Sequence, residues 1–158
     1  MLKIFQDRLN IYSAFCKYLE EAKLTNPRGL VVSKVQEEFY ENYDKDSCPI
    51  VVLQKGPFSL LKFDVDQFSI VMPTAFDLQL IAIDYSLKSF VEADLIAEEL
   101  LSGAIDAISN GLEKDNNTKD LMKQIEVQTI QWGPSEVNSN LYFSDIRAVI
   151  VCVLKYPY

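Results

Sequence analysis

The chain has 158 residues, a length that suits one domain and can bury a core without disulfides or metals. Hydrophobic residues make up 49% and charged residues 24%, which is a globular rather than a disordered composition. The 23 acidic and 15 basic residues leave a net charge of −8, which argues against binding nucleic acid or an anionic membrane by charge. The chain has no histidine, so Ser-His-Asp and Cys-His catalysis and histidine metal ligands are excluded.

No targeting or membrane segment is expected. The longest apolar run, residues 148–154, is far too short to span a bilayer, and the N-terminus becomes polar too soon for a signal peptide. The three cysteines, Cys16, Cys48 and Cys152, form no CxxC pair. They are interpreted as buried free thiols in a reducing compartment.

A helix is predicted over residues 2–23, because apolar residues recur every three or four positions. The central stripe consists of Phe5, Leu9, Tyr12, Cys16 and Leu19, and it is broadened by Ile4, Ile11, Phe15 and Tyr18. The favoured interpretation is a helix lying across a sheet, with a face wide enough for a second contact. Pro27 and Gly29 end this element.

Strands and loops are predicted next. A short strand is expected over 30–34, an exposed aromatic loop with acids over 37–46, and a strand over 49–54 that stops at Gly56-Pro57. Residues 58–66 half alternate and suit one arm of a hairpin. Residues 68–72 lead through Pro73 into a strand over 76–85, which turns apolar on both faces and should be central for part of its length.

The best-marked element is a second helix. Ser89 and Glu92 form a capping box at its start, and Asn110-Gly111 is the expected C-cap. A polar loop over 113–119 follows, and then a strand from Ile125 in which Val127 and Thr129 alternate toward Trp132. Residues 136–140 are expected to form a hairpin tip or flap, and 142–156 a strand inside the sheet. The prediction is one α+β domain over residues 1–158. It has a mostly antiparallel sheet of about five or six strands, an N-terminal helix and a second helix packed on one face.

Few residues suggest chemistry. Asp64 and Asp66 share one face of a strand, and paired carboxylates can hold a divalent cation or share a proton. Solvated acids on a hairpin are the favoured interpretation, because no third acid or glycine stands at calcium-loop spacing. Neither Gly56 nor Gly133 belongs to a phosphate-binding loop. No catalytic residue, cofactor or metal is therefore expected, and a metal-dependent enzyme using the two aspartates is a third possibility.

The order of elements resembles that of the tail terminator proteins of long-tailed bacteriophages and of related neck and tail-completion proteins. The resemblance covers nearly the whole chain. It is carried by the N-terminal helix, by the long strand that feeds a capped helix over 76–110, and by the hairpin that ends in an apolar strand over 125–156. No diagnostic motif carries it.

The resemblance implies a structural virion protein, a homo-oligomeric ring that is commonly a hexamer. Such a ring caps the tail tube and joins it to the head-completion or connector protein, and DNA passes through the lumen without being specifically bound. An acidic chain agrees with this role, because negative charge repels phosphate. The implied location is the tail or neck of the virion, after assembly in the host cytoplasm.

A ring needs two different patches that meet on neighbouring copies. We predict one patch on the first helix at Ile11, Phe15 and Tyr18. The other is predicted in the aromatic loop at Phe39, Tyr40 and Tyr43, where a hydrophobic cluster among acids suggests a partner. Trp132 is either an interface anchor or a cap on the core. The alternative function is a small acidic binding module, an adaptor or inhibitor, that acts as a monomer or dimer.

Overall fold

The computed structural model describes residues 3–38, 44–65, 68–133, 136–138 and 140–155; in 59–65, 68–73, 136 and 138 only the backbone is described. These residues form three helices and six strands. In chain order they are α1 (Lys3–Glu21), β1 (Val35–Gln36), β2 (Ile50–Val65), β3 (Phe68–Ser86), α2 (Phe90–Lys114), α3 (Asn116–Lys119), β4 (Met122–Trp132), β5 (Glu136–Asn138) and β6 (Leu141–Leu154). The predicted α+β class is confirmed.

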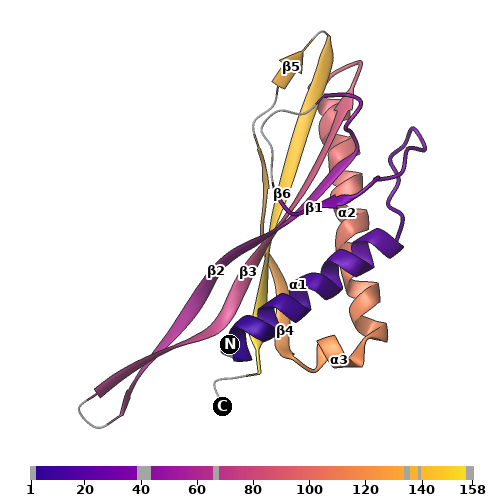
Figure 1. The fold of residues 1–158 in the computed structure, drawn as a ribbon. Helices are drawn as coiled ribbons and strands as arrows, with labels where there is room; N and C mark the ends of the chain where they lie inside the picture. Colours follow the sequence, from indigo (N-terminus) through magenta and orange to yellow (C-terminus); the bar gives the residue numbers. More distant parts are fainter. Residues whose placement is uncertain (1–2, 39–43, 66–67, 134–135, 139, 156–158) are drawn as a thin grey trace.

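The strands form one mixed sheet in the order β1-β2-β3-β6-β4, and β5 also pairs with β6. Only β1 and β2 run parallel; the other pairs are antiparallel. The helices α1 and α2 pack on one face of this sheet (Figure 1). As predicted, β3 and β6 are central strands.

The main core lies between the helices and the sheet. Leu78, Leu80 and Ala82 of β3 belong to it, together with buried residues of α1, α2 and β6. Ile81 and Ile83, which alternate with them, lie in a smaller apolar cluster on the opposite face. Burial on both faces explains why this part of β3 is apolar at successive positions.

The buried face of α1 lies within the predicted broad stripe, but its centre is shifted. Phe5 and Leu9, which were placed in the central stripe, are 41% and 40% exposed. The buried face is centred on Ile11, Phe15 and Tyr18, and it also includes Asp7, which forms an ion pair with Lys3; Ile4, Tyr12 and Leu19 complete its buried apolar residues. A stripe this broad fits two helix rotations, and contacts with α2 and the sheet decide between them.

The predicted stop at Gly56-Pro57 is wrong, because β2 continues to Val65. The pairing with β3 is irregular between Lys55 and Phe58, so Gly56 and Pro57 form a bulge and do not end the strand. Proline is tolerated there because β1 pairs with β2 only at Val51 and Val52, which leaves this stretch of β2 at the sheet edge. The strand expected over 30–34 is also absent; its place is taken by one bridge between Thr25 and Val31.

We call residues 60–65 of β2 and 68–73 of β3 the arm. The arm extends well beyond the other strands of the sheet (Figure 1). Its strands pair with each other and with no other described strand, since β3 begins to pair with β6 at Ala75. At the root, Phe58 packs against Phe5 and Phe76, with ring centroids 5.4 and 6.3 Å apart.

The α2 helix starts where its capping signal predicts. Ser89 is the N-cap, and its side chain accepts a hydrogen bond from the backbone N–H of Glu92. The Glu92 carboxylate accepts a hydrogen bond from the Ser86 hydroxyl instead of returning to the cap. The predicted C-cap at Gly111 is wrong: α2 continues to Lys114, and the expected loop 113–119 includes the short helix α3.

Candidate functional site

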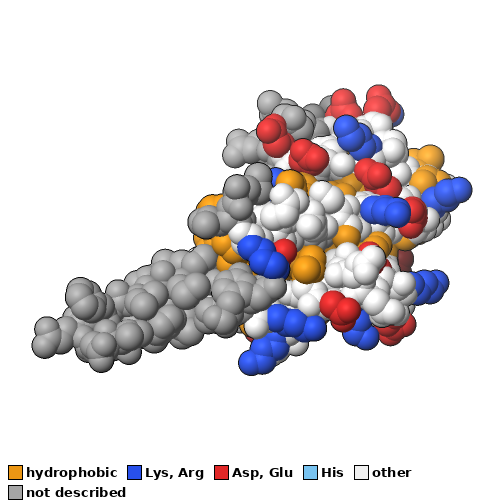
Figure 2. Space-filling view, turned by 60° about the horizontal axis from the view of Figure 1, so that its bottom comes forward, with side chains coloured by type: hydrophobic (Ala, Val, Ile, Leu, Met, Phe, Trp, Pro, Cys, Tyr) orange, Lys and Arg blue, Asp and Glu red, His pale blue; other side chains and the backbone are white. Residues whose placement is uncertain are grey.

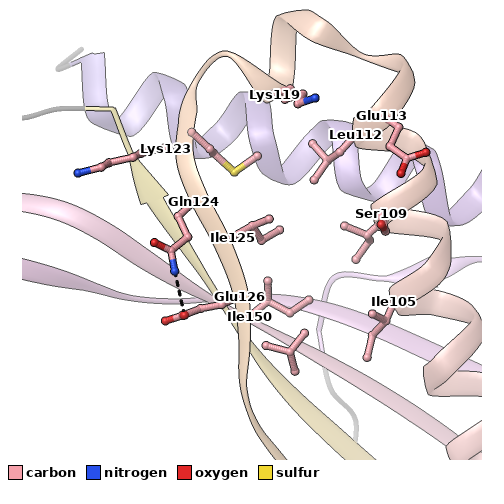
Figure 3. A pocket seen from close by; sticks show the side chains of 13 residues that line it. Ile105, Ser109, Leu112, Glu113, Lys119, Lys123, Gln124, Ile125, Glu126 and Ile150 are labelled. Atoms are coloured by element: carbon pink, nitrogen blue, oxygen red, sulfur yellow. Dashed lines mark hydrogen bonds between the residues drawn. The ribbon is translucent and has the colours of Figure 1, made fainter.

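A groove with a volume of about 420 Å³ lies between α2 and β4 (Figure 3). Its apolar lining comes from Ile105, Ile108 and Leu112 of α2, Met122, Ile125 and Val127 of β4, and Ile150 of β6. We call it the α2–β4 groove. It exists because α2 packs over β3 and β6 and leaves the edge strand β4 incompletely covered.

Three large apolar residues of β4, the first of which also lines the groove, extend this surface along the strand. Val127, Ile130 and Trp132 are 40%, 52% and 56% exposed. They pair with Ile150, Ala148 and Ile146 of β6, all core residues beneath the helices, so the three lie on the helix side of the sheet. We call them the β4 strip. An apolar row of this kind on an exposed edge is characteristic of an interaction surface.

A bulge creates the β4 strip. Strict alternation from Ile125 placed Val127 and Thr129 on one face, but the register shifts between Val127 and Thr129. Ile130 and Trp132 therefore join the face of Val127, and Thr129 pairs on the opposite face with Val149. The change of apolar positions from odd to even numbers was the available sequence signal for this bulge.

The polar rim of the groove consists mainly of amide and charged side chains. Glu126 accepts hydrogen bonds from the side-chain amides of Gln124, at 3.0 Å, and Gln128, at 2.7 Å. Lys119, Lys123 and Glu113 are exposed at the mouth. Covalent catalysis needs a nucleophile within hydrogen-bonding distance of a base, whereas the hydrogen bond between Gln124 and Glu126 in this lining joins an amide to a carboxylate. The arrangement suits binding of an apolar segment.

The outer edge of β4 is open. Among the described strands β4 pairs only with β6, because it ends the order β1-β2-β3-β6-β4. An edge strand presents backbone N–H and C=O groups that can pair with another chain. Here that edge runs beside an apolar groove, so added backbone pairing and side-chain burial can occur together.

The first predicted interface patch is wrong. Ile11 and Phe15 have no exposed surface, and Tyr18 is 8% exposed. Tyr18 packs near Phe15 and donates a hydrogen bond to the Asp115 carboxylate at 2.6 Å. These residues bind α1 to the rest of the chain, so none of them is available to a neighbour.

The other predicted interface residues are those of the aromatic loop and Trp132. Phe39, Tyr40 and Tyr43 lie outside the described residues, so the second patch stays a prediction. Trp132 is exposed in the β4 strip, which favours the anchor interpretation over a cap on the core. Asp64 pairs with Ser69 by its backbone in the arm, whereas Asp66 is outside the described residues.

Other groups that could carry chemistry are buried or structural. Burial raises the pKa of the Cys48 and Cys152 thiols to about 12, so they are poor nucleophiles near neutral pH. The fully buried Asp84 accepts hydrogen bonds from Arg28 at 2.6 Å and Asn26 at 3.0 Å. These two hydrogen bonds attach the loop after α1 to β3, and no local sequence pattern predicted them.

In the described part of the chain, no group of three or more acidic or cysteine side chains is placed to hold a metal ion. No helix among the described residues is long and apolar enough to cross a membrane. Comparison of the chain with protein-family models gives no match, and comparison with curated proteins gives none.

Proposed function

We propose that the protein is a structural subunit that assembles head to tail into a ring, in the manner of a phage tail terminator. The ring would cap the tail tube and join it to the head-completion protein in the virion. The observation that carries the proposal is the α2–β4 groove with its β4 strip beside an open strand edge. Such a surface needs a partner chain rather than a small substrate.

The position of this surface favours rings over symmetric dimers. It occupies one edge of the sheet, whereas the arm extends from β2 and β3 on the other side of β6. Contacts between two different patches of identical chains are heterologous, and they close into a ring when the rotation allows. The net charge of −8 on each chain would also repel the phosphates of DNA in a lumen.

The alternative is a small acidic binding module, an adaptor or inhibitor that acts as a monomer or dimer, and its DNA-mimicking form has less support. A DNA mimic needs a surface of one sign, because it competes for sites that bind phosphate. On the face shown in Figure 2, acidic and basic side chains are interspersed and hydrophobic side chains lie between them. This charge pattern offers no continuous acidic strip on that face.

The test is the mass of the protein in solution, measured by light scattering on a sizing column and by negative-stain images of the same peak. The proposal expects closed rings whose mass is a multiple of the 18.0 kDa chain. Ile130→Glu should reduce the rings to monomers, since it places a charge in the contact. Leu30→Glu is the matched control: Leu30 is also half exposed, at 47%, but lies in the loop after α1. A wild-type chain that stays at 18.0 kDa up to hundreds of micromolar would refute the proposal and favour the binding module.

A further inference from the structure

The backbone register of the arm separates its residues into two unlike faces. The cross-strand pairs Leu61–Met72, Phe63–Ile70 and Val65–Phe68 are apolar on both strands, and they alternate with Lys62–Val71 and Asp64–Ser69. Pairs that alternate along an antiparallel ladder belong to opposite faces of the ribbon. One face of the arm is thus composed entirely of large apolar residue types, and the other is mixed.

A two-stranded ribbon of this composition needs support. An isolated hairpin is marginally stable in water, and a third strand or a packed helix is what normally stabilises it. Beyond Phe58 the described strands add no third strand to the arm, because β1 pairs with β2 only at Val51 and Val52 and β6 pairs with β3 only from Ala75 on. The outer edge of the arm's β2 strand is open in the same way as that of β4.

The arm and the α2–β4 groove match in length. Six paired residues on each strand of the arm extend about 20 Å at ~3.3 Å per residue. The apolar part of β4, from Ile125 to Trp132, extends about 26 Å on the same measure. The arm can therefore lie along β4 over its whole paired length.

The charges do not oppose this contact, because the groove rim carries two acids and two bases, Glu113 and Glu126 with Lys119 and Lys123. The chain carries −8 in all, but residues 59–73 contain only Lys62, Asp64 and Asp66, and the β4 strip contains no charged residue. The repulsion expected between two acidic chains is thus weakest where these surfaces would meet, and depletion of charge is the usual mark of an interface core.

The arm cannot fill the groove of its own chain. In the sheet order, β6 and the body of β3 stand between the arm and β4, and the arm extends away from them (Figure 1). A second copy has no such restriction. We propose that the arm of one copy docks at the α2–β4 groove of the next: its open β2 edge pairs with the outer edge of β4, and its apolar face extends the helix-side face that carries the β4 strip. This inference names the contact within the ring and rests on the proposed function.

The test uses two variants with complementary defects. Ile130→Glu damages the β4 strip beside the groove and leaves the arm intact. Phe63→Lys with Ile70→Glu damages the arm's apolar face but keeps the hairpin, because residues 63 and 70 are cross-strand partners and opposite charges there attract. The control is Val71→Glu, which places an acid opposite Lys62 on the mixed face.

Each defective variant alone should be an 18.0 kDa monomer, whereas the control should assemble like the wild type. An equimolar mixture of the two defective variants should form a complex of two chains and nothing larger. The intact arm of one then meets the intact groove of the other, and no second junction is available. A groove-to-groove contact would give no such complex.

The outcomes separate the two proposals. If the wild type never assembles, the proposed function fails and this inference fails with it. If the wild type assembles but the arm variant assembles equally, or the mixture stays monomeric, only the inference fails. A cross-link makes the result independent of the variants' folding: benzoylphenylalanine in place of Trp132, in an otherwise wild-type ring, should react with residues 60–73 of a neighbour. Reaction with another segment alone would overturn the inference.

Discussion

Replacing each of two glycines in α2 by alanine should change the free energy of unfolding in opposite directions. Gly103 and Gly111 both lie inside the helix, where alanine is favoured over glycine by about 1 kcal/mol. A Cβ at Gly103 would lie 3.6 Å from Leu24, which is ordinary contact. A Cβ at Gly111 would lie 2.6 Å from two ring carbons of Tyr18, well inside contact distance. Gly103→Ala should therefore stabilise the protein by up to ~1 kcal/mol.

Gly111→Ala should destabilise it. Overpacking against a buried ring costs about 1–3 kcal/mol, because the ring must shift from its site. A shifted Tyr18 also weakens its hydrogen bond to Asp115, a loss of about 1 kcal/mol at this partly exposed position. Set against the gain of about 1 kcal/mol in helix propensity, the net loss is about 1–3 kcal/mol. In a chain of this size each 1 kcal/mol corresponds to a Tm shift of about 2–4 °C.

Urea denaturation followed by far-UV circular dichroism gives both free energies of unfolding. The decisive comparison repeats Gly111→Ala in a Tyr18→Ala background. Without the ring the substitution should become neutral or stabilising, because only helix propensity remains. If Gly111→Ala stabilises the wild-type chain as much as Gly103→Ala does, the claim that the Tyr18 ring requires a glycine at position 111 is refuted.

Three further outcomes follow from buried groups. Arg28→Ala should cost about 2–4 kcal/mol in urea denaturation, because Asp84 then keeps a buried carboxylate without its cation; a cost below ~1 kcal/mol would contradict this. Cys48 and Cys152 should resist a thiol reagent at pH 8 in the native protein and react in urea, since burial raises their pKa to about 12; rapid native labelling of both would disprove it. Burial, and then its bond to Asp115, raises the pKa of Tyr18 to about 12 from 10, so its contribution to stability is complete below pH 10 and is lost between pH 10 and 12. Tyr18→Phe should unfold with a shallower dependence on pH over that range, and an unchanged slope would count against the assignment.

Local sequence signals were sufficient to predict the elements that are fixed by interactions between residues close in the chain. Ser89 caps α2 because a serine oxygen reaches an N–H three residues away, whatever the rest of the chain does. The apolar run of β6 required burial on both faces, and so an interior position in the sheet. Together with the helical periodicity of residues 2–23, these two features indicated the α+β class.

The tertiary structure decided which of several equally patterned surfaces is buried. The broad stripe of α1 was compatible with an exposed Phe15 or an exposed Leu9, and packing on α2 and the sheet buried Phe15. Asn110-Gly111 is a sequence typical of a helix end, but the helix continues through it. The glycine is needed there because the ring of Tyr18, 93 residues earlier in the chain, occupies the space of a side chain.

The candidate site shows the same division. The sequence alone marked Trp132 as a possible anchor, but the groove beside it depends on which strand lies at the sheet edge. It also depends on a one-residue bulge that turns Ile130 toward the helix side. Strand order and register come from contacts between distant segments, which a local pattern of apolar residues does not encode.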